Sequence, residues 1–264
     1  MSRAASQAEL ESICLNALGK RSGEVAVLDV KSGRLSAHIR QGLSRPTYLP
    51  GSTAKLVTAY AGLSSGAINI RTSFGCRNVF KINGCSYTCT KPGGHGRLDI
   101  SHAISSSCNI WFYQAARKIG QKQIKRAWAS FGIHLDPGTY PVERLAIGEA
   151  GIQITPVQMA KIARQIAINK HRQGTAYPIL CEAMRMAVTH GTAVPLSNAP
   201  VAIAGKTGSS SHYRDANLRH GWFIGFAPYD KPQIAIAVLC LEGNSYRSAV
   251  PVTRKILEGL YADR

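Results

Sequence analysis

Residues 50–55 read Pro-Gly-Ser-Thr-Ala-Lys and run directly into the apolar segment 56–63. This pattern predicts a helix that begins near Ser52, which places Ser52 and Lys55 one turn apart on the same face. The start of a helix offers unpaired backbone N–H groups and the positive end of the helix dipole, which favour a neutral lysine beside a nucleophilic serine. Ser52 also fits an ordinary helix N-cap, so the rest of the chain decides between these interpretations.

The composition indicates a globular chain that can bury a full core. It has 264 residues, 45% of them hydrophobic, and no apolar run approaches the length of a membrane span. The formal net charge is +18, and the basic residues are dispersed along the chain. Such a charge favours polyanions, which include nucleic acid, anionic lipid headgroups and acidic envelope polymers, or else serves as a solubilising surface.

The order of the predicted elements favours a mixed fold. A helix is expected over 9–18, and segments 25–30 and 34–39 form a strand-turn-strand pattern. The later expected elements are helices over 99–118 (broken at 105–109), 121–130, 155–168 and 178–188, strands over 201–204, 221–226 and 233–241, and a last helix over 250–261. Because strands and helices do not alternate, we expect an α/β protein of the α+β type: an antiparallel β-sheet flanked by helices, plus a helical lobe. The Gly-rich stretch 66–96 is expected to be irregular, with a turn at 83–84.

Two further motifs carry polar side chains that suit catalysis. Ser107 and Asn109 lie two residues apart in the helix break and, read alone, fit a cap or a turn. Lys206, Thr207 and Gly208 lie at the end of the expected strand that starts at 201. A strand with Lys and Thr on alternate faces, followed by Gly, offers an ammonium, a hydroxyl and close backbone access. Ser-x-x-Lys, Ser-x-Asn and Lys-Thr-Gly, in this order, are typical of penicillin-binding proteins and serine β-lactamases.

On these motifs the chain resembles the transpeptidase domain of class B penicillin-binding proteins. Further similar segments are residues 94–96, 146–148, 155–156 and 221–228. The resemblance runs from about residue 24 to the end and implies one transpeptidase-like domain over 1–264. It would consist of an α/β lobe of about 1–50 and 200–264 and a helical lobe of about 51–199. The N-terminal anchor and the pedestal domain that are usual in this class are expected to be absent.

The resemblance also implies a peptidoglycan D,D-transpeptidase mechanism. Ser52 would attack acyl-D-Ala-D-Ala stem peptides, form an acyl-enzyme and bind penicillin covalently. Lys55 would take the serine proton, with its pKa lowered by the helix start and by nearby Lys206. Ser107 would relay the proton to the leaving amine, and Asn109 would orient Lys55 and the substrate amide.

Substrate binding falls to the third motif in the same scheme. Lys206 and Thr207 would bind the terminal carboxylate beside Gly208, and the backbone N–H groups of Ser52 and Ser209 would form the oxyanion hole. Two residues of the following polar loop, His212 and Tyr213, are further candidates for substrate contact.

Two other functions stay open. A class D-like serine β-lactamase needs a base that activates water, and Glu143 and Glu149 are the acids near the relevant stretch, although neither lies in a recognisable version of it. Glu149 and Ala150 stand where the family more often has Gln-Gly. A non-catalytic penicillin-sensor module is the second alternative. Turnover of a chromogenic cephalosporin, as opposed to a stable adduct, would favour the lactamase.

Three of the seven cysteines, Cys76, Cys85 and Cys89, lie in the Gly-rich stretch, which suggests a disulfide or a metal. A zinc site of these three with His95 has eight, three and five intervening residues, unlike the usual close ligand pairs, so we expect no metal and no cofactor. Class B relatives often carry a cysteine pair here, and the resemblance therefore implies a Cys76–Cys89 disulfide. Cys108 is expected to be a small buried packing residue.

The resemblance places the protein in the periplasm or on the outer face of the cytoplasmic membrane, with a signal or anchor that is not in this chain. The expected partners are peptidoglycan stem peptides, β-lactam antibiotics and, because of the charge, anionic envelope polymers or lipid headgroups. No specific nucleic-acid partner is expected.

Overall fold

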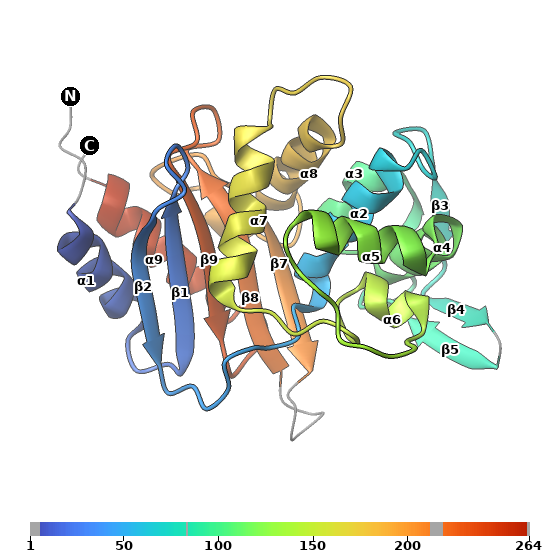
Figure 1. Ribbon diagram of the computed structural model, residues 1–264, viewed down its shortest axis with the longest axis horizontal. Coiled ribbons are helices and arrows are strands. Elements are labelled where there is room, and N and C mark those ends of the chain that lie inside the picture. Colours follow the sequence, from blue (N-terminus) through green and yellow to red (C-terminus); the bar gives the residue numbers. More distant parts are fainter. Residues whose placement is uncertain (1–5, 83, 212–218, 263–264) are drawn as a thin grey trace.

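A five-stranded antiparallel sheet forms the centre of the computed structural model, which describes residues 6–82, 84–211 and 219–262. The strands, in the spatial order β2-β1-β9-β8-β7, are β2 (Leu35–Gln41), β1 (Gly23–Asp29), β9 (Ile234–Cys240), β8 (Arg219–Ala227) and β7 (Ala204–Ser211). Every neighbouring pair is antiparallel, and helices lie on both faces (Figure 1). The predicted antiparallel sheet flanked by helices is therefore confirmed.

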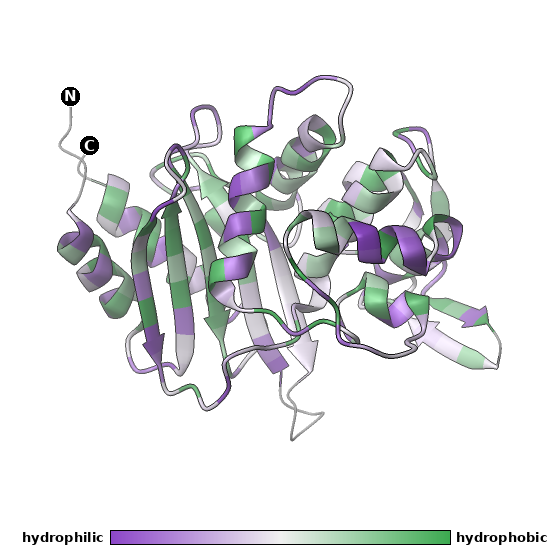
Figure 2. Ribbon diagram, in the orientation of Figure 1, coloured by the Kyte–Doolittle hydropathy of each residue, from purple (hydrophilic) through white to green (hydrophobic). Residues whose placement is uncertain are grey.

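The central strands are apolar because both of their faces are covered. Along β1, Val25 and Val27 pack in one core cluster, whereas Ala26 and Leu28 pack in the other. β9 is likewise buried at nearly every position and is mostly green in Figure 2, whereas β7 is pale. Continuous apolar runs are typical of strands covered on two sides.

Two pairs of helices cover the sheet. The helices α1 (Gln7–Leu18) and α9 (Ala249–Tyr261) pack against each other on one face. The helices α7 (Pro156–Ile168) and α8 (Tyr177–Thr189) lie on the other face, with α7 across β1, β8 and β9 and α8 beside β7 (Figure 1). Within the described ranges, no helix has the length and apolar character to cross a bilayer.

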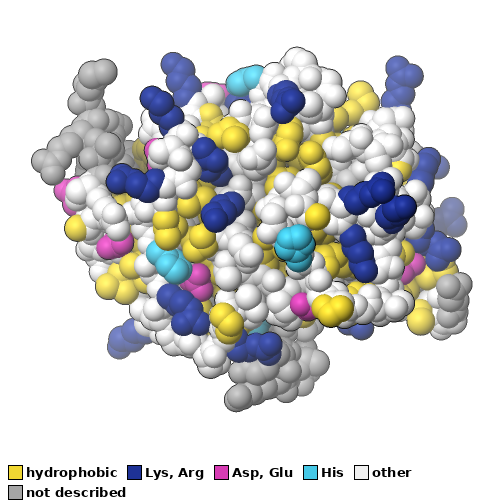
Figure 3. Space-filling model, in the orientation of Figure 1, with side chains coloured by type: hydrophobic (Ala, Val, Ile, Leu, Met, Phe, Trp, Pro, Cys, Tyr) yellow, Lys and Arg dark blue, Asp and Glu magenta, His cyan; other side chains and the backbone are white. Residues whose placement is uncertain are grey.

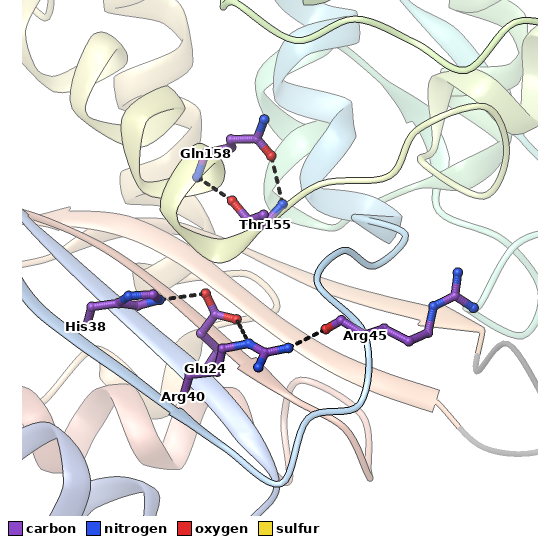
Figure 4. Close-up of polar contacts among 6 residues, drawn as sticks. All are labelled: Glu24, His38, Arg40, Arg45, Thr155 and Gln158. Carbon is purple, nitrogen blue, oxygen red and sulfur yellow. Dashed lines mark hydrogen bonds and ion pairs between the residues drawn. The ribbon is translucent and has the colours of Figure 1, made fainter.

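The start of α7 is fixed by a reciprocal cap. The Thr155 hydroxyl accepts the Gln158 N–H at 3.1 Å, and the Gln158 side chain accepts the Thr155 N–H at 2.9 Å (Figure 4). Pro156 occupies the first turn, where a missing N–H costs nothing. The sequence signal at residues 155–156 thus predicted this helix correctly.

A buried carboxylate joins the sheet edge to the loop that leads to Ser52. Glu24 on β1 is only 2% exposed and accepts from His38 at 2.9 Å and from Arg40 at 3.5 Å, both on edge strand β2. Arg40 also donates to the carbonyl of Arg45 at 2.7 Å (Figure 4). Because its two oxygens contact His38 and Arg40, Glu24 can stay buried. Through Arg40 it also holds the loop at Arg45 in place.

The remaining helices gather beside β7. They are the 3₁₀ turn η1 (Gly51–Ala54), α2 (Lys55–Ser64), α3 (Ile100–Ser105), α4 (Asn109–Ile119), α5 (Gln121–Ser130), α6 (Val142–Ala146) and the 3₁₀ turn η2 (Val194–Leu196). α2 is buried from Lys55 to Gly62 except at Tyr60, and it contacts α4, α5 and α8. A helix that is apolar on all sides belongs inside a core, and α2 carries the nucleophile turn there. The proposed lobe boundaries near residues 50 and 200 stay a prediction.

The expectation that residues 66–96 are irregular is wrong. The stretch 66–96 contains two small antiparallel sheets, one of β3 (Phe74–Cys76) with β6 (Gly96–Leu98), and one of β4 (Val79–Ile82) with β5 (Cys85–Thr88). These strands are short and largely polar, so they give no apolar periodicity. The turn expected at 83–84 includes Asn83, which lies outside the described residues.

The strand of the third motif is also displaced from its predicted position. β7 spans Ala204–Ser211, so Lys206, Thr207 and Gly208 lie within the strand and not at its end. Residues 205–211 are Gly, Lys, Thr and Ser, which have weak strand propensity on their own. Pairing along the whole of β8 makes this segment extended, and that contact is not visible in the local sequence.

Candidate active site

The nucleophile turn packs directly against β7. Gly51 has φ +52°, and a Cβ at this position would collide with the backbone of Ser209. A Cβ on Gly208 would lie 3.0 Å from the carbonyl oxygen of Pro50 and 2.8 Å from the Thr53 side chain. Only glycine permits this approach on either side. It sets the Ser209 backbone beside the turn that carries Ser52, as the oxyanion-hole prediction requires; the hole itself stays a prediction.

Lys55 is the centre of the hydrogen-bond network. Its side chain is fully buried, and Nζ donates to Ser52 Oγ at 2.9 Å. It also lies within hydrogen-bond distance of the Ser107 carbonyl at 2.8 Å, the Ser107 hydroxyl at 3.2 Å and Asn109 Oδ1 at 2.5 Å. Lys55 Nζ therefore contacts residues of both the first and the second motif, as the roles predicted from sequence for Lys55 and Asn109 require.

Ser107 connects the two buried lysines. Its hydroxyl accepts from Lys206 Nζ at 2.9 Å as well as from Lys55 Nζ at 3.2 Å. Lys206 Nζ also donates to the Thr207 carbonyl at 2.8 Å. Ser107 adopts φ 57°, a conformation that non-glycine residues rarely take and that surrounding structure must hold in place. The arrangement forms a continuous path for a proton from Ser52 through Lys55 to Ser107 and Lys206.

Burial disfavours two ammonium groups at this spacing. It lowers the pKa of Lys55 from the ordinary value of 10.5 to about 8. Burial first, and then the charge of Lys55, hold the pKa of Lys206 well below 10.5. The predicted lowering for Lys55 is confirmed in direction, but its largest cause is burial and not the neighbouring ammonium. A neutral lysine within reach of Ser52 Oγ can act as its base.

The network opens into a cleft of about 420 Å³. Ser52, Ser107 and Asn109 line it on one side and Thr207, Gly208 and Ser209 on the other. The Lys206 side chain is fully buried and faces Ser107, so it is not among the cleft-lining residues. This position favours a role for Lys206 in orienting the Ser107 hydroxyl, and leaves carboxylate binding, expected for Lys206 from sequence, to groups on the cleft surface.

Sequence reasoning missed several residues that line the same cleft. They include Thr90, Thr192, Arg219, Asn244, Ser245 and Tyr246. The Thr192 hydroxyl lies 2.5 Å from that of Thr207, and the Ser245 N–H donates to Ser209 Oγ at 3.2 Å. Because β7 and β9 run parallel to each other, the loop after β9 meets the end of β7. The strand order would have identified this loop, but no local motif does.

The comparisons with known proteins agree with this geometry. A model of the penicillin binding protein transpeptidase domain matches residues 17–258. The chain belongs to this family. The resemblance that rested on the three motifs is thereby confirmed, and the cleft between them is the expected active site of a transpeptidase domain.

Curated relatives and solved structures extend the match. The chain is 26% identical to the peptidoglycan D,D-transpeptidase MrdA of Acinetobacter baumannii, over 80% of this chain and 42% of that protein. It is 27% identical to the peptidoglycan D,D-transpeptidase PbpA of Mycolicibacterium smegmatis, over 77% of this chain and 52% of that protein. The chain thus spans about half the length of these relatives.

Solved structures show the same fold. Pseudomonas aeruginosa PBP2 in complex with WCK 5153 matches with a TM-score of 0.84 and 22% identity, over 94% of this chain and 76% of that one. The penicillin G acyl-enzyme complex of penicillin-binding protein A from M. tuberculosis matches with a TM-score of 0.81 and 20% identity, over 95% and 78%. The transpeptidase-like architecture is therefore confirmed at the level of the fold.

Glu149, named from sequence as a possible base, also lies at the cleft. It lines the cleft together with Ser52, and its carboxylate accepts from the Ser211 hydroxyl at 3.3 Å. Burial raises its pKa, while Arg219 and Ser211 oppose the shift. It also lines an adjoining hollow of about 530 Å³ that reaches towards β5. Glu143, by contrast, is buried and pairs with Arg117 at 3.4 Å, away from Ser52.

The cysteine prediction requires a correction. All seven cysteines lie in the part of the chain that the structure describes, and all are free thiols. The expected Cys76–Cys89 disulfide is absent, and the two sulfurs instead lie 3.6 and 3.3 Å from His95 Nδ1. Cys108 is buried as expected but lies 3.9 Å from Cys89, whereas Cys85 is exposed.

A larger hollow of about 860 Å³ lies between the end of α2 and the segment before α8, and none of the motif residues line it. The motif residues therefore make the cleft at Ser52 the candidate active site. His212 and Tyr213, named from sequence as substrate contacts, lie outside the described residues.

Proposed function

We propose that this chain is the catalytic domain of a peptidoglycan D,D-transpeptidase that forms an acyl-enzyme on Ser52. The observation that carries the proposal is the buried network in which Lys55 joins Ser52 to Ser107 and Asn109 at the floor of an open cleft. The names of the curated relatives support a transpeptidase over the class D-like β-lactamase and the penicillin-sensor alternatives.

Acylation begins with neutral Lys55 accepting the proton of Ser52, whose oxygen attacks the carbonyl of the penultimate D-Ala. The carbonyl oxygen becomes an oxyanion that the backbone N–H groups of Ser52 and Ser209 stabilise. As the C–N bond breaks, the proton passes from Lys55 through Ser107 to the leaving amine of the terminal D-Ala. Lys206, at 2.9 Å from Ser107 Oγ, orients that hydroxyl.

The second half of the reaction reverses these roles. An acceptor amine from another stem peptide attacks the ester, loses its proton to Lys55, and forms the cross-link while Ser52 regains its hydrogen. The hydroxyls of Thr207 and Ser209 face the cleft and are suited to the terminal carboxylate of the donor. A β-lactam carries its leaving amine within the same molecule, so its acyl-enzyme forms by the same attack and the amine stays attached.

Covalent labelling tests the proposal. Purified protein is incubated with a fluorescent penicillin, and the adduct is located by peptide mass spectrometry. We expect one label per chain on Ser52, and none on Ser52→Ala, with circular dichroism unchanged between the two proteins. Ser12→Ala removes an exposed serine hydroxyl on α1 and serves as the matched control, which should label like the parent.

Two results would count against the proposal. Absence of label on the parent protein at high drug concentration excludes an acylating site, and label on another serine reassigns the nucleophile. A chromogenic cephalosporin separates the remaining possibility, because rapid turnover without a lasting adduct is the behaviour of a β-lactamase. We expect a stable adduct.

We propose further that the enzyme works outside the cytoplasm, against anionic polymers or lipid headgroups of the envelope. The support is the net charge of +18, which Figure 3 shows as Lys and Arg side chains spread over the visible face without a single dense cluster. Dispersed charge favours weak, salt-sensitive attraction. Sedimentation with phosphatidylglycerol vesicles should show binding at low salt that is lost at high salt; no binding at low salt would contradict the idea.

A further inference from the structure

Four metal-ligating side chains converge behind the second motif. The sulfurs of Cys76, Cys89 and Cys108 and Nδ1 of His95 all lie within 4.8 Å of one another. The individual separations include 3.3 Å and 3.6 Å from sulfur to nitrogen and 3.9 Å between the sulfurs of Cys89 and Cys108. Zinc with bonds of about 2.3 Å to sulfur and about 2.0 Å to nitrogen has tetrahedral edges of roughly 3.5–3.8 Å.

We propose that these four residues bind one Zn²⁺ and that the bound metal holds the Ser107–Asn109 turn in its reactive conformation. The site would replace the disulfide inferred from the family resemblance, and it does not depend on the proposed transpeptidase activity. Zinc binding displaces the three thiol protons into solvent and leaves a Cys₃His centre, a usual set for structural zinc. A Cys76–Cys89 disulfide would use only two of the four converging groups.

The backbone brings the ligands together from four segments. Cys76 ends β3 opposite Gly96 of β6, and the Cys89 N–H donates to the Asn78 carbonyl at 2.8 Å. Gly94 has φ +85°, and a Cβ there would collide with the backbone of Cys76. The two small sheets and this glycine therefore converge on one point, which the buried thiols occupy.

Burial matches the coordination chemistry of a closed site. Cys76 is 1% exposed, Cys89 8% and Cys108 0%, so the sulfurs are shielded from solvent. Structural zinc sites are closed in this way, with four protein ligands and no open position. Cys85, nearest in sequence, is exposed and outside the cluster, which makes it a natural control.

Cys108 links this cluster to catalysis. It stands between Ser107 and Asn109, and its sulfur accepts the Trp111 N–H at 3.4 Å as the N-cap of α4. Ser107 holds the left-handed φ of 57°, a strained conformation that needs support from its surroundings. A metal–sulfur bond at Cys108, the residue next to Ser107, would supply that support, so Cys108 is a positioning residue.

Metal analysis of protein purified under reducing conditions, without chelator or affinity metal, tests the site. We expect about one zinc per chain by mass spectrometry of the metal content, and sulfur-to-cobalt charge-transfer bands when Co²⁺ replaces zinc. Cys76→Ser and Cys89→Ser should lose the metal, and Cys85→Ser should keep it. No zinc and no cobalt bands in the reduced parent, or a Cys76–Cys89 disulfide found by alkylation and mass spectrometry, would overturn the site.

The positioning role has a separate test that does not rely on a variant folding. Zinc is removed from the parent protein by a chelator and then restored, and the rate of acylation by fluorescent penicillin is followed throughout. We expect a fall of roughly tenfold or more on removal and recovery on restoration. An equal rate with and without zinc would overturn the positioning role. Because zinc content is measured without penicillin, failure of the transpeptidase proposal leaves the metal test intact.

Discussion

The Ser107–Asn109 turn separates two clusters of opposite chemistry. On one side Ser107 and Asn109 contact Lys55 in a network of hard, protonatable groups that opens into a cleft. On the other side Cys108 joins two further buried thiols, Cys76 and Cys89, and the partly buried imidazole of His95. Adjacent residues of one turn thus serve a reaction and a scaffold.

The two sides differ in what they contribute to folding. The catalytic side buries two lysines with no carboxylate within ion-pair distance among the residues that the structure describes. Such an arrangement lowers the free energy of unfolding. The cysteine side gathers buried sulfur ligands, which stabilise a fold when a metal binds. Strain at a reactive site held by a stable neighbour is a common division of labour. Variants on the two sides should therefore change stability in opposite directions.

Replacement of Lys206 should have the largest effect on rate. In Lys206→Met the hydroxyl of Ser107 loses one of its two lysine contacts, and we expect acylation to fall by about 10²–10⁴-fold. The free energy of unfolding in urea should stay equal or rise, because methionine fills the volume without a buried charge. Acylation kinetics and urea unfolding measure the two quantities.

Lys170→Met is the matched control for that substitution. Lys170 donates to the Tyr229 carbonyl at 2.7 Å and lies over the tyrosine ring, far from the motifs in the fold. Lys170→Met should therefore lower the free energy of unfolding by about 1 kcal/mol and leave the acylation rate unchanged. If Lys206→Met also lost stability in step with its rate, the proposed contrast between the two clusters would be wrong.

The pH dependence of acylation tests the catalytic side next. Burial lowers the pKa of Lys55 to about 8, and only the neutral amine can accept the Ser52 proton. The rate should therefore rise about tenfold per pH unit below 8 and level off above it. Asn109→Asp puts a negative charge 2.5 Å from Lys55, which raises its pKa and should move the profile to higher pH by about one unit or more. A pH-independent rate in both proteins would contradict Lys55 as the base.

Sequence reasoning could predict the catalytic side because its residues lie in three short motifs. Ser52 and Lys55 are one helical turn apart, so local geometry alone brings them together. The convergence of Lys206 on Ser107 spans 99 residues and was accessible only through the order of the motifs, not through a physical pattern. The sheet was predictable in the same way, since β9 and β8 are apolar runs of strand length.

The cysteine side was only partly predictable: the sequence indicated Cys76, Cys89 and His95 as possible ligands, but their irregular spacing argued against a metal and the fourth ligand, Cys108, was missed. Cys85 fits the sequence cluster better than Cys108, yet the hairpin of β4 and β5 leaves Cys85 exposed. From sequence, Cys108 was expected to be a small buried packing residue within a catalytic motif. β7 failed for a related reason, since its polar residues become a strand only through pairing with β8. Contacts between distant segments decide both cases.

Loss of one cysteine ligand should reduce stability more than it reduces chemistry. We expect Cys76→Ser to lower the free energy of unfolding by about 1–3 kcal/mol, since it breaks a buried cluster, and Cys85→Ser to stay within about 0.5 kcal/mol. Urea unfolding in reducing buffer with excess zinc measures both. Equal stabilities for the two variants would mean that the buried cluster contributes nothing to the fold, contrary to the contrast drawn here.

Glu149→Gln should have the smallest effect on acylation, and it tests whether Glu149 belongs to the catalytic side. Its carboxylate contacts Ser211 but none of the residues that hydrogen-bond Lys55, so we expect it to take no part in acylation. We expect acylation to change by less than about tenfold, or ~1.4 kcal/mol in the barrier, and the lifetime of the penicillin adduct to stay similar. The adduct lifetime is the decisive readout, measured by mass spectrometry after excess drug is removed. A much longer lifetime in Glu149→Gln would show that this carboxylate activates water in the parent, and the catalytic side would then include Glu149.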